Sequence, residues 1–369
     1  MNSKVPLYPV GFDHGNAESS IVILDNANQS YRQKMPSYLA QGSLDKIVNA
    51  RSSRGDTYLR KSDALRSDEI VIEYQNREYL VGDLALRESQ DASAAYGDIS
   101  RYWQLRAVLL LLALSGKALQ EREYALHVVT GLPVETFTNE NREQVKERLS
   151  GEYPYWYRGE HRTAHITVAK VVTEGVGVLI TEGESDPATL QGVIDIGGRT
   201  TDVMAARGVS TVADMSQGRA IGVEQVGKIL SNFFDIYYKR PLSYDERRVL
   251  LYRYSEGIEL PALKAQGKIV DKGQLRGWIE QAIADVAQDV ASFVSSIPGW
   301  GTSEKGTVAG NIDPLFVVGG GTYYFFDAIK ERIPHAKKLA VQSEYANAEG
   351  YAHLARRSLQ RSQNQEIAV

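Results

Sequence analysis

One short pattern occurs twice in this sequence and constrains the fold more than any other feature. Residues 9–16 (the first loop) read PVGFDHGN, and residues 192–202 (the second loop) read GVIDIGGRTTD. In both, an apolar run contains an aspartate, glycine and small polar residues follow, and another apolar run comes next. This is typical of a strand, a tight turn and a second strand, with backbone amides free to meet phosphate. Two copies about half a chain apart predict two similar lobes that face one nucleotide.

The length and composition exclude several classes of protein. A chain of 369 residues is too long for one simple core, which favours two lobes. The net charge of −4 gives no general attraction to nucleic acid, and the absence of cysteine excludes disulfides and thiol catalysis. The apolar run 107–114 is far shorter than the roughly 20 residues of a membrane helix and predicts a buried helix. No secretory leader opens the chain, so we expect a cytoplasmic protein without direct membrane or nucleic-acid contacts.

Hydrophobic periodicity predicts strands that alternate with helices, and hence an α/β fold. Hairpins are expected at residues 5–24 and 70–81, and strands at 124–130, 165–173, 177–181 and 315–322, the last running into a glycine turn. Helices are expected at 100–119, 139–150, 222–239, from Ser243 onward and at 272–296. Ser243 and Glu246 have the spacing of a capping box. The apolar stripe of 272–296 favours packing onto its own lobe over a coiled coil.

Two further segments allow more than one interpretation. The aromatic stretch 153–157, YPYWY, predicts either an exposed patch used in self-contact or packing within a lobe. Residues 301–307 have the spacing of a Walker A loop but lack the lysine after the second glycine. Without that lysine no side chain reaches the phosphates in the Walker manner, so we expect a loop there.

The two loops supply most of what triphosphate chemistry requires, which is backbone amides, carboxylates for hydrated magnesium and a group that orients water. Asp13 and Asp195 would approach the metal. The backbones expected near the β- and γ-phosphates are those of Gly15, Asn16, Gly197, Gly198, Arg199 and Thr200. Either loop alone would be interpreted as an ordinary β-turn. The pair, with Gly319-Gly320-Gly321 after a third apolar strand, favours nucleotide binding.

The order of these motifs resembles the actin, chaperone-ATPase and sugar-kinase superfamily, and within it the ParM/StbA-type prokaryotic actins. Further matching segments are MPS at 35–37, VGDLA at 81–85, VTGLPV at 129–134 and YANAEGY at 345–351. The resemblance implies a two-lobed actin-like (ribonuclease H-like) fold, each lobe a mixed sheet flanked by helices. It places the first lobe at 1–190 with an inserted subdomain at about 37–95, the second at 191–345 with a helical insertion at about 228–300, and a return helix and tail at 346–369.

The resemblance also implies roles for individual residues. Asp13 and Asp195 correspond to the loop aspartates at the metal, and Asp202 lies near the attacking water. Glu174 falls where actins place the residue that positions this water, although its chemistry alone describes a solvated carboxylate at a strand end. Adenosine contacts are implied for Gly319, Gly320, Gly321, Gly222 and Glu224. Glu224 could instead stabilise a helix dipole.

Three residues depart from the family pattern. His14 and Ala17 replace residues that are usually smaller or hydroxylic, which leaves the side-chain contacts of the first loop open. Arg199 stands where many actins have a small residue, and it either reaches a phosphate or faces solvent.

The implied function is a Mg²⁺-dependent ATP (or GTP) hydrolase that assembles with copies of itself into filaments. Plasmid or DNA segregation through a DNA-binding adaptor protein, or another prokaryotic cytoskeletal role, would be its task. The alternatives are a small-molecule, sugar-type kinase of the same superfamily, and a scaffold that binds nucleotide without hydrolysis.

Overall fold

The computed structural model describes residues 5–25, 27, 29–52, 65–89, 93–94, 99–302, 308–339 and 342–367. Most of the Walker-like stretch 301–307 and part of the predicted insertion 37–95 therefore lie outside the described residues. The chain divides into two compact units, residues 1–182 with 345–369 and residues 183–344. Each unit holds a mixed sheet flanked by helices, so the predicted α/β class is confirmed.

In the described part of the first unit, ten strands form one sheet in the order β3-β2-β1-β8-β10-β9-β5-β6-β4-β7. Strands β1, β8 and β10 run parallel, and the other neighbouring strands are antiparallel. Their bounds are β1 (Leu7–His14), β2 (Glu18–Leu24), β3 (Ser30–Pro36), β4 (Tyr38–Gln41), β5 (Ile70–Tyr74), β6 (Arg77–Val81), β7 (Ser93–Ala94), β8 (Glu123–Leu132), β9 (Gly151–Tyr157) and β10 (Glu160–Thr173).

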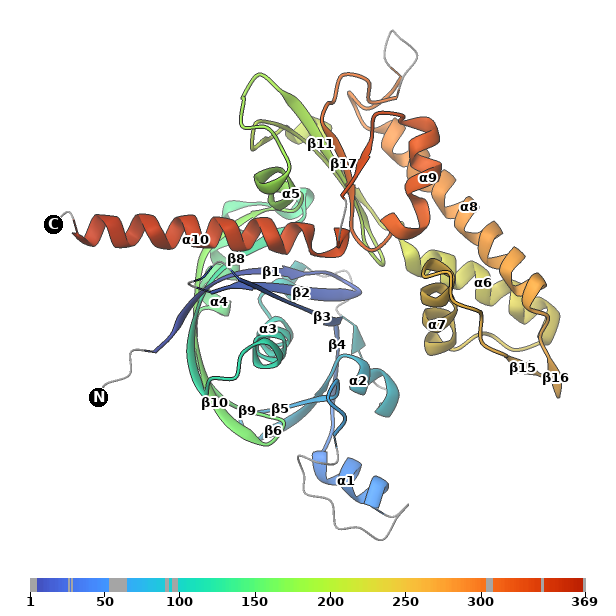
Figure 1. Ribbon diagram of the computed structural model, residues 1–369, viewed down its shortest axis with the longest axis horizontal. Coiled ribbons are helices and arrows are strands. Elements are labelled where there is room, and N and C mark those ends of the chain that lie inside the picture. The colour runs from blue at the N-terminus through green and yellow to red at the C-terminus, as the bar shows by residue number, and fades with distance from the viewer. Residues whose placement is uncertain are drawn as a thin grey trace. The chain divides into compact units, whose positions relative to one another are not determined.

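The first-unit sheet curls around α3 (Leu105–Ala118), as Figure 1 shows. Every residue from Ala107 to Gly116 on this helix is buried, because a helix that is apolar all round needs partners on all sides. The predicted buried helix is confirmed. No helix in the part of the chain that the structure describes is long and apolar enough to cross a membrane.

The opposite face of this sheet is covered by α10 (Ala346–Ile367), which contacts β1, β8 and α5 (Val176–Thr181). A Cβ on Gly11 would lie 1.9 Å from the carbonyl oxygen of Ala348, and one on Gly350 would lie 1.8 Å from that of Gly177. Only glycine allows backbones to approach this closely. The other helical segments of the unit are α1 (Leu44–Ser52), α2 (Asp83–Glu88), η1 (Ile99–Tyr102), η2 (Val134–Thr136) and α4 (Asn139–Leu149).

The second unit is built on a smaller mixed sheet in the order β13-β12-β11-β17-β18, with β14 paired to β12. Its strands are β11 (Leu190–Ile196), β12 (Thr201–Arg207), β13 (Ser210–Thr211), β14 (Gln217–Arg219), β17 (Leu315–Val318) and β18 (Lys337–Lys338), with a separate hairpin of β15 (Lys264–Ala265) and β16 (Lys268–Ile269). Its helical segments are η3 (Ala213–Met215), α6 (Val223–Tyr238), α7 (Tyr244–Ser255), α8 (Lys272–Ser296), α9 (Thr322–Arg332) and η4 (Ser343–Tyr345).

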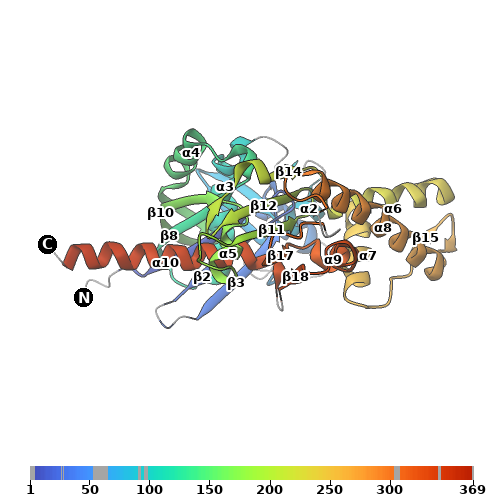
Figure 2. The same cartoon turned by 90° about the horizontal axis from the view of Figure 1, so that it is seen from above.

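The helices of the second unit begin and pack largely as their sequence patterns predict. The capping box of Ser243 and Glu246 is present at the start of α7. Helix α8 contacts α6 and α9, which lie beside it in Figure 2. Its apolar stripe is therefore buried within its own unit, and the coiled-coil alternative is not needed.

Three local predictions require correction. Residues 177–181 are not a strand but belong to α5, because Gly175 takes a left-handed conformation (φ 88°) that ends the extended path of β10. The helix predicted from residue 100 begins at Leu105, after the short turn η1. The exposed-patch interpretation of 153–157 is wrong for its tyrosines, which alternate inward along β9 and are buried.

A directed chain of hydrogen bonds braces the turn between β1 and β2. His14 Nδ1 lies 2.8 Å from Ser19 Oγ, Ser19 Oγ lies 2.8 Å from Ser37 Oγ, and Ser37 Oγ donates to the Gly15 carbonyl at 2.7 Å. A carbonyl can only accept, so Ser37 donates to it, Ser19 donates to Ser37, and the remaining donor is His14 Nδ1–H. His14 thus carries a proton on Nδ1.

Burial keeps His14 neutral over the physiological range. Its side chain is enclosed, and desolvation together with the guanidinium groups of Arg101 and Arg106 lowers its pKa to about 3. The sequence left the side-chain contacts of His14 open, and the structure supplies them: His14 faces the core beneath the first loop and stacks on Phe12.

The close approach of α10 predicts the effect of alanine at Gly350. The added methyl would overlap the backbone of α5, so Gly350→Ala should destabilise the protein by about 1–3 kcal/mol, measured by urea unfolding. Gly277→Ala on α8 is the matched control, because its Cβ meets nothing within 4 Å. That control should stabilise by roughly 0.5–1 kcal/mol through helix propensity. Equal effects of the two substitutions would contradict the packing described here.

The buried His14 predicts a loss of stability in acid. Its pKa rises from about 3 in the folded state to about 6.5 in the unfolded state, so the unfolded chain binds the extra proton between these values. The free energy of unfolding should therefore fall as the pH drops below 6.5, by about 2 kcal/mol from this group between pH 7 and pH 5. His14→Gln should flatten the dependence by that amount in urea titrations at the two pH values. An unchanged slope would show that His14 titrates normally.

Candidate nucleotide-binding loops

The second loop connects β11 to β12 and presents two carboxylates on one face. Asp195 and Asp202 are directly opposite each other in the antiparallel pair, so their side chains project from the same side of the hairpin. The turn between the strands is closed by a hydrogen bond from the Gly197 N–H to the Thr200 carbonyl, 2.8 Å long. Both aspartates are partly exposed.

The glycine turn at residues 319–321 packs directly against this loop. The Gly321 N–H donates to the Ile196 carbonyl at 2.7 Å. A Cβ on Gly319 would lie 2.4 Å from Asp195 Oδ1, and one on Gly321 would lie 2.3 Å from Ile196 Cγ2. Gly319 also has a φ of 83°, which other residues rarely adopt. The structure therefore brings together two motifs that are more than a hundred residues apart in the sequence.

The start of α6 closes over the same turn. A Cβ on Gly222 would lie 2.7 Å from both the Arg199 nitrogen and the Gly197 carbonyl oxygen. The next two amides donate to the turn, Val223 to Gly197 at 3.3 Å and Glu224 to Gly198 at 2.7 Å. The predicted second-unit residues thus form one constellation around the second loop.

Arg199 and Glu224 are partners of each other. Arg199 Nε lies 2.8 Å from Glu224 Oε1, and the two side chains are 14% and 22% exposed. The sequence left open whether Arg199 meets phosphate or solvent, and whether Glu224 meets ribose or a helix dipole. The ion pair is an arrangement that neither alternative included, since the two residues are distant in sequence and meet only when α6 packs on the turn.

The first unit holds the other predicted residues. Asp13 lies on β1 beside the buried His14, and because successive strand side chains alternate, its partly exposed carboxylate faces the other side of the sheet. Gly15 and Asn16 form the turn that follows. Glu174 comes directly after β10, where its N–H donates to the Leu132 carbonyl at 2.8 Å.

Two residues that sequence reasoning missed connect Asn16 to Glu174. Arg101 donates through Nη1 to Asn16 Oδ1 and through Nη2 to the Tyr102 hydroxyl. The Tyr102 hydroxyl in turn donates to Glu174 Oε1 at 2.9 Å. Arg101 and Tyr102 stand in η1, in a stretch without a recognisable motif, so no local signal indicated this contact.

The start of α10 supports the Glu174 segment. The Gly175 N–H donates to Asn347 Oδ1 at 3.0 Å. A Cβ on Gly131 would lie 2.2 Å from the Tyr351 hydroxyl and 3.2 Å from Glu174 Cγ. The matched segments 129–134 and 345–351 are therefore neighbours of Glu174, which gives a structural reason for both.

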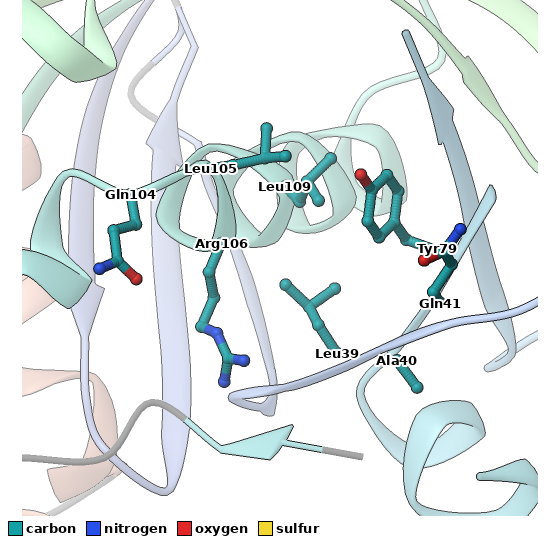
Figure 3. Close-up of a pocket in the computed structure, with 8 residues that line it drawn as sticks. All are labelled: Leu39, Ala40, Gln41, Tyr79, Gln104, Leu105, Arg106 and Leu109. Atoms are coloured by element: carbon teal, nitrogen blue, oxygen red, sulfur yellow. The ribbon is translucent and has the colours of Figure 1, made fainter. Parts of the chain in front are cut away.

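A hollow of about 430 Å³ in the first unit lies apart from these residues. It is open to one side and lies between the first turns of α3 and the strands β4 and β6 (Figure 3). Its lining residues are Leu39, Ala40, Gln41, Tyr79, Gln104, Leu105, Arg106 and Leu109. Burial lowers the pKa of the Arg106 guanidinium in this wall. None of the candidate site residues predicted from the sequence lines the hollow.

We compared the chain with known protein families and solved structures. Residues 11–177 match the family model described as the N-terminal domain of actin-like proteins. No curated protein sequence matches the chain. An archaeal actin homologue solved as a complex with ADP is 20% identical, with a TM-score of 0.71, over 96% of this chain and 100% of that one.

Two bacterial structures are similar over the same extent. Bacillus thuringiensis ParM with ATP is 16% identical, with a TM-score of 0.67, over 96% of this chain and 99% of that one. A 15-stranded ParM filament from Clostridium botulinum is 19% identical, with a TM-score of 0.69, over 96% of this chain and 100% of that one. Because the identities are this low, the structural similarity establishes the fold alone. The actin-like fold expected from the resemblance to ParM-type actins is therefore confirmed, and residues 11–177 match the family of actin-like N-terminal domains.

Proposed function

We propose that the protein is a Mg²⁺-dependent actin-like ATPase that forms nucleotide-dependent filaments. The observation that carries the proposal is the convergence of Asp195, Asp202, the start of α6 and the glycine turn on the second loop. Glycine-rich turns beside a helix N-terminus suit phosphate groups. The ADP and ATP bound to the similar archaeal and Bacillus proteins support ATP as the nucleotide, with GTP as the alternative.

Different residues would contact the phosphates and the adenosine of the nucleotide. Backbone groups of Gly15, Asn16 and residues 197–200 would meet the β- and γ-phosphates. Gly222, Glu224 and the glycine turn would meet the adenosine, where a Cβ at Gly320 would meet no protein atom within 4 Å. Arg199 would keep Glu224 oriented through their ion pair.

The carboxylates present fit a magnesium ion. No group of three histidine or acidic side chains in the described residues could hold a metal, but Mg²⁺ in nucleotide sites needs only one or two carboxylates beside phosphates and waters. Asp195 and Asp13 would hold it, with Asp202 on the same face as Asp195. When bound, the ion would neutralise charge on the phosphates.

Glu174 would accept a hydrogen bond from the attacking water and orient it toward the γ-phosphate. Loss of that phosphate would weaken filament contacts between copies of the chain. The Clostridium botulinum filament supports assembly of this kind. We propose plasmid or DNA segregation, or another prokaryotic cytoskeletal role, in the cytoplasm. A net charge of −4 makes a DNA-binding adaptor necessary for segregation.

Sedimentation with ATP and Mg²⁺ tests the function. The purified protein should pellet and show filaments by electron microscopy, without stimulation of turnover by sugars. Glu174→Gln should still pellet but hydrolyse ATP about 100-fold more slowly, because the water is no longer held by a carboxylate. Sugar-stimulated turnover without pelleting would favour the kinase, and nucleotide binding without hydrolysis would favour the scaffold.

The glycine turn provides a separate test of nucleotide binding. Gly320→Ala adds a methyl group into space free of protein atoms, so the melting temperature should stay within about 2 °C. The affinity for ATP should fall about tenfold or more, measured by calorimetry, because the methyl occupies room that adenosine needs. Gly277→Ala, also in open space, is the control and should leave the affinity unchanged. Unchanged affinity in Gly320→Ala would remove the glycine turn from the adenosine site.

A further inference from the structure

We propose that Arg101 and Tyr102 are positioning residues that couple Asn16 of the first loop to the carboxylate of Glu174. The inference rests on the proposed function, in which Asn16 approaches phosphate and Glu174 orients water. All four residues belong to the first unit, so the coupling operates within that unit.

The direction of each hydrogen bond in this chain is fixed by chemistry. A guanidinium has donors only, so Arg101 must meet the carbonyl oxygen of the Asn16 amide and a lone pair of the Tyr102 hydroxyl. The hydroxyl then donates its single hydrogen bond to Glu174 Oε1, 2.9 Å away. The chain runs from a cation through a neutral hydroxyl to an anion, and no link can reverse.

Arg101 and Tyr102 are both buried, so their polar groups need partners within the protein. Arg101 is 8% exposed and Tyr102 is 3% exposed, and the guanidinium lies 4.4 Å from the centre of the Tyr102 ring. A buried cation needs nearby negative charge or hydrogen-bond acceptors. Asn16, the Tyr102 hydroxyl and ring, and Glu174 beyond it supply these. Burial and the Glu174 charge also raise the pKa of Tyr102, so the phenol keeps the proton that it donates.

The chain therefore makes the orientation of Glu174 depend on the place of Asn16. If the first loop moves when its amides bind or release phosphate, Arg101 loses the Asn16 acceptor. Its hydrogen bond to the Tyr102 hydroxyl then changes as well. The hydrogen bond from the Tyr102 hydroxyl fixes the position of Glu174 Oε1 and with it the orientation of the carboxylate. A loop contact is thus transmitted to the carboxylate through two side chains.

Kinetics of Tyr102→Phe test the coupling. The variant lacks only the hydroxyl, so we expect kcat for ATP to fall about 10- to 100-fold while KM stays within about threefold. The matched control is Tyr124→Phe, which removes a fully buried hydroxyl bonded to Ser115 and Tyr155 in the same unit. It should keep the wild-type kcat. Tyr102→Phe added to Glu174→Gln should cause little further loss, because both act through one carboxylate.

A readout without activity separates this inference from the proposed function. In nucleotide-free protein, Tyr102→Phe and Asn16→Ala should both increase hydrogen exchange of the backbone at residues 173–176 several-fold, while Tyr124→Phe should not. If the wild type hydrolyses no ATP but exchange changes as expected, the coupling stands and the ATPase proposal fails. Unchanged exchange at 173–176 in both variants overturns the coupling. In an active enzyme, additive losses in the double variant overturn it as well.

Discussion

Direct contact of backbone on backbone, at positions where only glycine fits, is the constraint on which both units depend. In the first unit Gly11 and Gly350 bring α10 against β1 and α5. In the second, Gly222, Gly319 and Gly321 bring α6 and the glycine turn against the second loop. Contacts of this kind fix the main chain itself, so their precision does not depend on side-chain rotamers. Asp195 is held in place because the glycine turn and the start of α6 pack closely against the loop that carries it.

The first loop is held in place by hydrogen bonds from polar side chains, whereas the second is held by close packing at glycine positions. His14, Ser19 and Ser37 brace the turn from below through hydrogen bonds whose directions are all determined. Arg101 holds it at Asn16. These groups are buried, so each lost bond would leave an unsatisfied polar atom and cost about 1–3 kcal/mol. The network is therefore a strong brace only while it is complete.

The sequence predicted those features that depend on local periodicity. The bounds of the helix 272–296 and the capping box at Ser243 follow from apolar spacing and a short hydrogen-bonding pattern, and both are confirmed. The segment 177–181 was misjudged because a short apolar run suits a strand or a helix equally, and the left-handed turn at Gly175 decided it. The pairing of Arg199 with Glu224 could not be predicted, because it arises from the packing of α6 on a distant turn.

The same reasoning explains why the Arg101–Tyr102 connection escaped prediction while the loops did not. A phosphate loop is encoded by adjacent residues. The hydrogen bonds described above instead join residues 16, 101, 102 and 174, which come together only because the sheet curls around α3. The two loops consequently differ in how they can respond to a ligand. Close-packed backbone has one arrangement, but a chain of side-chain hydrogen bonds can exchange partners. If the protein binds nucleotide as proposed, we therefore expect a conformational response to phosphate at the first loop and Glu174, while the second loop keeps its arrangement.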